Sequence, residues 1–104
     1  MAYKLRFVQK FEKAKKEQFL QIEKKFIDLE NAEPDFPIGK RFLPKTGREA
    51  INTLIWEAEF RNMEDAISAL QKMEESSLHN AIFSEQVKYM TDTYTEIYEE
   101  FIYN

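Results

Sequence analysis

Residues 51–66 read INTLIWEAEFRNMEDA, and this stretch decides the fold of the chain. Its first ten side chains alternate between two faces, and the more apolar face carries Leu54, Trp56, Ala58 and Phe60. Alternation with a period of two predicts a strand. Asn62 then suits a helix N-cap, because its side chain can accept a bond from the first turn, where Glu64 and Asp65 are favourable. The stretch therefore predicts a strand that runs directly into a helix.

The sequence before this stretch predicts a strand, a helix and a short strand. Residues 3–11 alternate and predict a strand. Residues 12–32 change to a helical period, with one apolar stripe made by Phe19, Ile22, Phe26 and Leu29. Pro34 ends that helix, since proline disfavours the helical conformation in the residue before it. Residues 38–44 predict a short, weak strand.

The helix continues over residues 66–73. A second helical stretch follows over residues 78–90, and a strand over residues 93–103. The order is βαββαβ, which is the ferredoxin-like arrangement of the α+β class. It predicts a single domain over residues 1–104, with one antiparallel sheet in the order 4-1-3-2 and the helices on one face. The other sheet face is partly apolar, so we expect a second copy to cover it.

Charge is distributed unevenly along the 104 residues, whose net charge is −4. Residues 1–48 hold 12 basic and 7 acidic side chains, and residues 49–104 hold 3 basic and 12 acidic ones. Such a split is typical of a basic arm with an acidic tail, or of a fold whose halves neutralise each other. In the order 4-1-3-2 the basic first strand lies between two acidic strands, which favours the second interpretation.

Composition excludes several classes of function. The chain has no cysteine, which removes disulfides, thiolate zinc sites and iron–sulfur clusters, and its one histidine removes a multi-histidine metal site. Its two glycines, Gly39 and Gly47, are in the wrong context for a phosphate-binding loop. No apolar run is long enough to span a membrane, and the N-terminus lacks a signal-peptide core. We expect a soluble, cytoplasmic protein that binds neither membrane nor metal.

Three segments together resemble the dimeric α+β barrel superfamily, and within it the NIPSNAP-like proteins. They are KLRFVQKF (residues 4–11), NTLIWEAEFRNMEDA (residues 52–66) and SSLHNAIFSEQVKYM (residues 76–90). The resemblance implies a homodimer that packs through its sheet faces. The superfamily includes cofactor-independent monooxygenases, haem-degrading enzymes and many proteins of unknown activity.

The haem-degrading members differ from this chain at their functional residues. They place an asparagine on the first strand, and a tryptophan and a histidine about ten residues apart on the second helix. Here Gln9 takes the first-strand position, and Trp56 lies on a strand 23 residues before His79. The resemblance therefore implies no haem-degrading residues in this chain. The predicted cofactor is none, and haem is the alternative.

Two sets of side chains are candidates for a site. His79 lies in the apolar arc of its helical stretch, one turn after Glu75, and this pair could orient a general base or could be purely structural. Arg6, Lys10, Glu57 and Glu59 should share the dimer-facing side of the sheet. They could bind a polar ligand in the barrel interior, or they could form a set of ion pairs that only fixes strand register.

The predicted function is the binding of a small ligand in the barrel cavity, and the alternative is a cofactor-independent or haem-using monooxygenase. RNA binding is disfavoured, because the third strand lacks the glycine–aromatic signature of RNA-recognition domains and carries two acids. An open apolar cavity that reaches His79 would favour an enzyme. An interior closed by ion pairs would argue against one.

Overall fold

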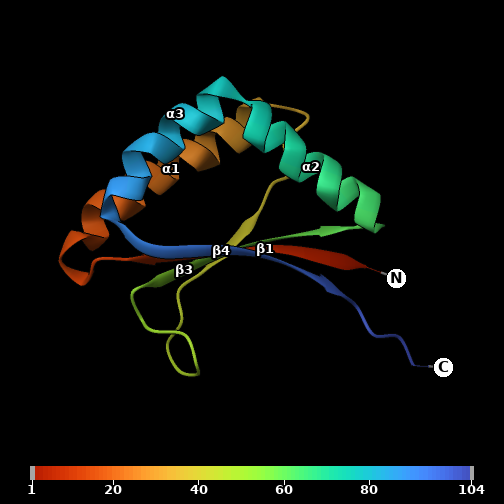
Figure 1. Ribbon diagram of the computed structural model, residues 1–104, viewed down its shortest axis with the longest axis horizontal. Coiled ribbons are helices and arrows are strands. Elements are labelled where there is room, and N and C mark those ends of the chain that lie inside the picture. The colour runs from red at the N-terminus through yellow and green to blue at the C-terminus, as the bar shows by residue number, and fades with distance from the viewer. Residues whose placement is uncertain (1, 104) are drawn as a thin grey trace.

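The computed structural model describes residues 2–103 and contains four strands and three α-helices within them (Figure 1). In chain order the elements are β1 (Tyr3–Phe11), α1 (Lys16–Ala32), β2 (Lys40–Phe42), β3 (Thr53–Phe60), α2 (Met63–Glu75), α3 (Ser77–Gln86) and β4 (Met90–Glu99). Short 3-10 turns at Lys13–Lys15 and Val87–Tyr89 precede α1 and β4. No helix in this part of the chain has both the length and the apolar character needed to cross a membrane.

The four strands form one antiparallel sheet in the order β2-β3-β1-β4. This is the predicted 4-1-3-2 order, and the ferredoxin-like α+β fold is confirmed. All three helices lie on one side of the sheet, and the loop between β2 and β3 lies on the other (Figure 1). We call the side without helices the open face.

The uneven charge is neutralised within the sheet, as the sequence predicted. Arg6 of β1 lies opposite Glu57 on β3 and opposite Glu96 on β4. Its guanidinium approaches both carboxylates, at 2.8 Å to Glu57 and 3.4 Å to Glu96. The basic strand is thus held between two acidic ones, which excludes the alternative of a separate basic arm and acidic tail.

The core between sheet and helices has two buried clusters. The larger consists of Leu5, Trp56, Ala58, Ala69 and Met73. The second consists of Phe11, Phe19 and Leu54, in which the rings of Phe11 and Phe19 stack with their centroids 4.6 Å apart. The helix-facing alternation predicted for the first and third strands is therefore correct.

Caps determine where the second and third helices begin. The Asn62 side chain accepts a hydrogen bond from the Asp65 amide at 2.8 Å, as predicted. Ser76 breaks the helical run and caps the next helix, because its Oγ accepts a bond from the His79 amide at 3.1 Å. Two helices therefore replace one long helix between Met63 and Gln86.

The boundaries of the last strand were predicted incorrectly. The α-helix ends at Gln86 and not at Met90, and β4 covers Met90–Glu99 in place of residues 93–103. The cause is pairing with β1, because Phe11 pairs with Met90 at one end and Tyr3 pairs with Glu99 at the other. Beyond Glu99 the strand has no pairing partner on β1, so good strand formers such as Phe101 and Tyr103 remain outside the sheet.

Candidate functional site

A cavity of about 290 Å³ lies between the sheet and the helices. Its walls are mainly apolar side chains from both layers, chiefly Phe7, Phe26, Phe36, Trp56, Met73 and Phe83. The rings of Phe7 and Trp56 stack with centroids 4.7 Å apart, and Phe26 lies 4.9 Å from the His79 ring. Aromatic faces thus line a space that reaches His79.

Gly39 lies directly against the indole of Trp56 in the cavity wall, where there is no room for a Cβ atom. We expect Gly39→Ala to lower the free energy of unfolding by about 1–3 kcal/mol, the usual cost of overpacking. Urea unfolding followed by circular dichroism measures this. Gly47→Ala is the wrong control, since Gly47 has a positive φ of 118°. Ala50→Ser is a better control, because Ala50 is exposed. Equal stability of Gly39→Ala and Ala50→Ser would contradict the close contact between Gly39 and Trp56.

A buried polar cluster of Glu23, Glu30, Arg41 and Gln86 adjoins the aromatic wall. Arg41 Nε donates to Glu23 at 2.6 Å, and Arg41 Nη2 donates to Glu30 at 2.5 Å. Gln86 Nε2 donates to Glu23 at 2.8 Å. Burial raises the pKa of Glu23, against the opposing effects of Gln86 and Arg41. The cluster joins α1, β2 and α3, and three of its members line the cavity.

His79 lies near the start of α3 and lines the cavity, and its buried Nδ1 has no hydrogen-bond partner among residues 2–103. Burial lowers the pKa of His79, against the opposing effects of Asn80 and Glu30. The ring is therefore neutral at pH 7 and can accept a proton.

Glu75 does not join His79. The two side chains would meet four residues apart only on a continuous helix. Here Glu75 ends α2, Ser76 breaks the run, and Glu75 is exposed outside the cavity lining.

The single histidine makes a direct test possible. We expect a pKa for His79 below its ordinary value of 6.5, measured from its Hε1 proton resonance across a pH titration. The unfolded chain then binds the proton more tightly than the folded one. Stability is therefore lost as the pH falls from 6.5 towards the folded pKa, and this loss should be absent in His79→Gln. A pKa of 6.5 or higher would contradict the assignment.

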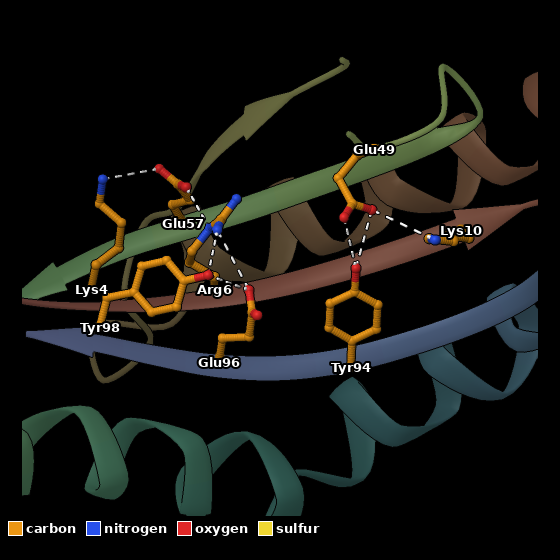
Figure 2. Close-up of polar contacts among 8 residues, drawn as sticks. All are labelled: Lys4, Arg6, Lys10, Glu49, Glu57, Tyr94, Glu96 and Tyr98. Atoms are coloured by element: carbon orange, nitrogen blue, oxygen red, sulfur yellow. Dashed lines mark hydrogen bonds and ion pairs between the residues drawn. The ribbon is translucent and has the colours of Figure 1, made fainter. Parts of the chain in front are cut away.

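The other predicted site residues lie on the open face, away from the cavity. Arg6 contacts Glu57 and Glu96, and its Nη1 also donates to the Tyr98 hydroxyl at 3.1 Å (Figure 2). Lys4 approaches Glu57 from the other side at 3.5 Å. The set is therefore paired within one chain.

Lys10 and Glu59 take no part in that set. Lys10 contacts Glu49 from the β2–β3 loop at 3.6 Å, and Glu49 also accepts a bond from the Tyr94 hydroxyl at 3.0 Å (Figure 2). Glu59 is exposed and makes no ion pair with any residue between 2 and 103. A ligand role for these four residues stays a prediction from the sequence.

Sequence reasoning missed Glu23, Glu30 and Arg41. A signal was present, because Glu23 and Glu30 fall on the same helical stripe as Phe19 and Phe26. Carboxylates on an apolar stripe need a buried partner. In the part of the chain that the structure describes, no three acidic or histidine side chains gather in a way that could hold a metal ion.

No family model matches the sequence, and no curated protein matches it. Solved structures do match, and they decide the fold. The chain has the fold of NIPSNAP family proteins. The likeness to these structures confirms the ferredoxin-like fold that the resemblance implied.

Three of these structures show the extent of the match. A NIPSNAP family protein from Agrobacterium tumefaciens has a TM-score of 0.76 at 12% identity, covering 99% of this chain and 89% of its own. An uncharacterised NIPSNAP domain protein from Burkholderia xenovorans has a TM-score of 0.77 at 10% identity, and the match covers 100% of this chain and 98% of that one. An antibiotic biosynthesis monooxygenase has a TM-score of 0.74 at 9% identity, and the match covers 96% of this chain and 99% of that one. At such identities the likeness concerns architecture.

Proposed function

We propose that this protein binds a small, largely apolar molecule in the cavity between the sheet and the helices. The observation that carries the proposal is an aromatic-walled cavity of about 290 Å³ reached by polar side chains. Ligand pockets usually measure roughly 300–1,000 Å³, so the ligand belongs to the small end of that range. An apolar cavity of about 150 Å³ is already enough to hold benzene.

Polar groups at the cavity supply the specificity that such a site needs. Gln9 is only 8% exposed and lines the cavity, and no residue in the described part of the chain bonds its side-chain oxygen. The Nδ1 of His79 has no hydrogen-bond partner among these residues either. An unsatisfied buried polar atom costs roughly 1–3 kcal/mol, so a ligand that supplies a donor is favoured over a pure hydrocarbon. Rotation about the soft terminal torsion of Gln9 can turn its oxygen towards that donor.

The test uses Trp56, which is the only tryptophan and forms part of the cavity wall. We expect 3-phenyl-1-propanol to change its fluorescence saturably. Thr95→Phe should abolish the change, because Thr95 lines the cavity from β4. The control is Thr91→Phe on the same strand, outside the lining, which should bind normally. Absence of saturation in the wild type would reject the proposal.

We propose further that the functional unit is a homodimer packed through the open face. Large apolar side chains remain exposed there, with Phe42 at 48% and Tyr98 at 47%. Arg6 on the same face is already paired within its own chain, so its burial leaves no isolated charge. The homodimer is also what the resemblance implies.

Sedimentation at micromolar concentration tests the homodimer. The wild type should sediment as a dimer and Phe42→Glu as a monomer. Ile67→Glu, on the exposed side of α2, should leave the dimer intact. A monomeric wild type would contradict this proposal.

A second candidate function is a cofactor-independent, monooxygenase-like enzyme acting in the same cavity. The observation that favours it is His79, whose lowered pKa keeps the imidazole neutral and able to remove a proton from a bound phenol. Oxygen uptake with 1-naphthol is the assay. Uptake that disappears in His79→Gln would support an enzyme, and no uptake above the protein-free rate would leave binding alone.

The cavity residues do not fit haem. Haem brings two carboxylates, whereas the only cationic side chain of the lining, Arg41, is already bound to Glu23 and Glu30. The volume of about 290 Å³ also lies at the lower limit for ligand pockets in general. We expect no Soret shift when haem is titrated into the wild type or into His79→Ala.

A further inference from the structure

We infer that the cavity discriminates by charge, taking an organic amine and rejecting a carboxylic acid of the same shape. This inference rests on the proposed function, because it names the class of molecule that the cavity would bind. Three observations carry it: an arginine already paired with two carboxylates, an excess of carboxylates, and aromatic rings beside a buried amide oxygen that no described residue bonds.

The one cationic side chain of the lining is already paired with two carboxylates of its own chain. Arg41 donates from Nε to Glu23, and from Nη1 and Nη2 to Glu30. Its Nη1 also lies 3.4 Å from the carbonyl oxygen of Gly39. A ligand carboxylate that took two N–H bonds from Arg41 would have to displace one of these partners. It would then leave a buried carboxylate unpaired, which is strongly unfavourable.

Carboxylates outnumber that cation in the lining. Glu23, Glu30 and Glu74 all contribute to the cavity wall, against Arg41 alone. With His79 neutral, the lining carries a net negative charge, and it stays negative even when Glu23 takes up a proton. Like charges brought together at a binding site are costly, whereas an ammonium ion is attracted.

The remaining surface suits an ammonium group with an apolar body. Phe7, Phe26, Phe36 and Trp56 present rings to the cavity, and the faces of such rings attract cations. The oxygen of Gln9, buried without a partner, can accept an N–H bond. An amine therefore gains from the charge of the lining, from its rings and from its free acceptor at once.

The experiment compares three ligands that share one carbon skeleton: 3-phenylpropylamine, 3-phenyl-1-propanol and 3-phenylpropanoate. Trp56 fluorescence at pH 7 reports binding. We expect the amine to bind most tightly and the carboxylate to bind at least about tenfold more weakly, since like-charge contacts are costly. A carboxylate that binds as tightly as the amine would overturn the inference while leaving the proposed function standing. If none of the three binds, the proposed function fails as well.

A matched pair of variants assigns the preference to the cavity. Glu74 and its neighbour Glu75 are both exposed, but only Glu74 lines the cavity. We expect Glu74→Gln to reduce the amine-to-carboxylate affinity ratio by about twofold to fivefold, the range for a partly exposed charge. Glu75→Gln should leave the ratio unchanged. An equal change in both variants would mean that general surface charge sets the preference, and would overturn the inference.

Discussion

Arg41→Met is expected to lower the free energy of unfolding by about 3–5 kcal/mol, the usual cost of breaking a buried ion pair from one side. The side chain of Glu23 is 6% exposed and that of Glu30 is 10% exposed. Removal of Arg41 leaves both carboxylates buried without their cation. Urea unfolding at pH 7, followed by circular dichroism, measures the loss.

Acid and a compensated variant provide the controls for Arg41→Met. Unpaired carboxylates have raised pKa values in the folded state, so their penalty is present at neutral pH and shrinks as the pH falls towards their unfolded values. The stability gap to wild type should therefore narrow as the pH falls from 7 towards about 4.3, the ordinary pKa of a glutamate. Adding Glu23→Gln and Glu30→Gln to Arg41→Met should recover much of the loss. A gap of less than about 1 kcal/mol at pH 7, typical of exposed ion pairs, would contradict the buried cluster.

The second large effect concerns the buried cluster of Phe11, Phe19 and Leu54. Phe19→Ala should cost about 3–5 kcal/mol, as expected for truncation of a buried aromatic ring. Phe19 is fully buried and stacks on Phe11 at 4.6 Å. Phe19 does not line the cavity, so the folded variant should still bind 3-phenyl-1-propanol.

Phe101→Ala is the matched control, since Phe101 is 76% exposed and a surface substitution usually changes stability by less than about 0.5 kcal/mol. Equal midpoints for the two phenylalanine variants in urea would show that the buried cluster has been assigned wrongly. Loss of ligand binding in a folded Phe19→Ala would instead show that the cavity depends on this cluster.

The fold was predictable because its signals are local. Alternation in Tyr3–Phe11 and in Thr53–Phe60, with the Asn62 cap between strand and helix, was enough to predict the topology. The predicted strand boundaries were wrong where pairing between strands, and not the strand-forming tendency of the residues, decides where a strand ends. The end of β4 is set by the start of β1 at Tyr3, and residues 101–103 stay outside the sheet despite their strand-forming side chains.

The site was less predictable because its contacts are not local. Arg41 meets Glu23 across 18 residues, and Gln86 meets Glu23 across 63. No spacing rule brings those residues together. The sequence did place Arg6 and Glu57 on one face of neighbouring strands, because strand alternation fixes which side chains share a face. A set of ion pairs there was one of its two alternatives, and Arg6 and Glu57 do form an ion pair. His79 lines the cavity on the helical side of the sheet. Arg6 lies on the open face, where it contacts Glu57 and Glu96 (Figure 2).

The predicted sign of an enzyme and the predicted sign against one are found on different faces of the sheet. Ion pairs join the side chains around Arg6 on the open face. An apolar cavity reaching His79 lies between the sheet and the helices. The two layers can therefore have separate tasks, with assembly on one side of the sheet and ligand binding on the other.

The most direct test of the binding cavity is an amide chemical-shift map of the ¹⁵N-labelled protein titrated with 3-phenyl-1-propanol. Saturable shifts should gather at residues that line the cavity from different elements, such as Gln9, Glu30, His79 and Thr95. Residues on the open face, such as Lys4 and Glu96, should shift little. Shifts that centre on the open face, or no saturable shifts at millimolar ligand, would contradict the account.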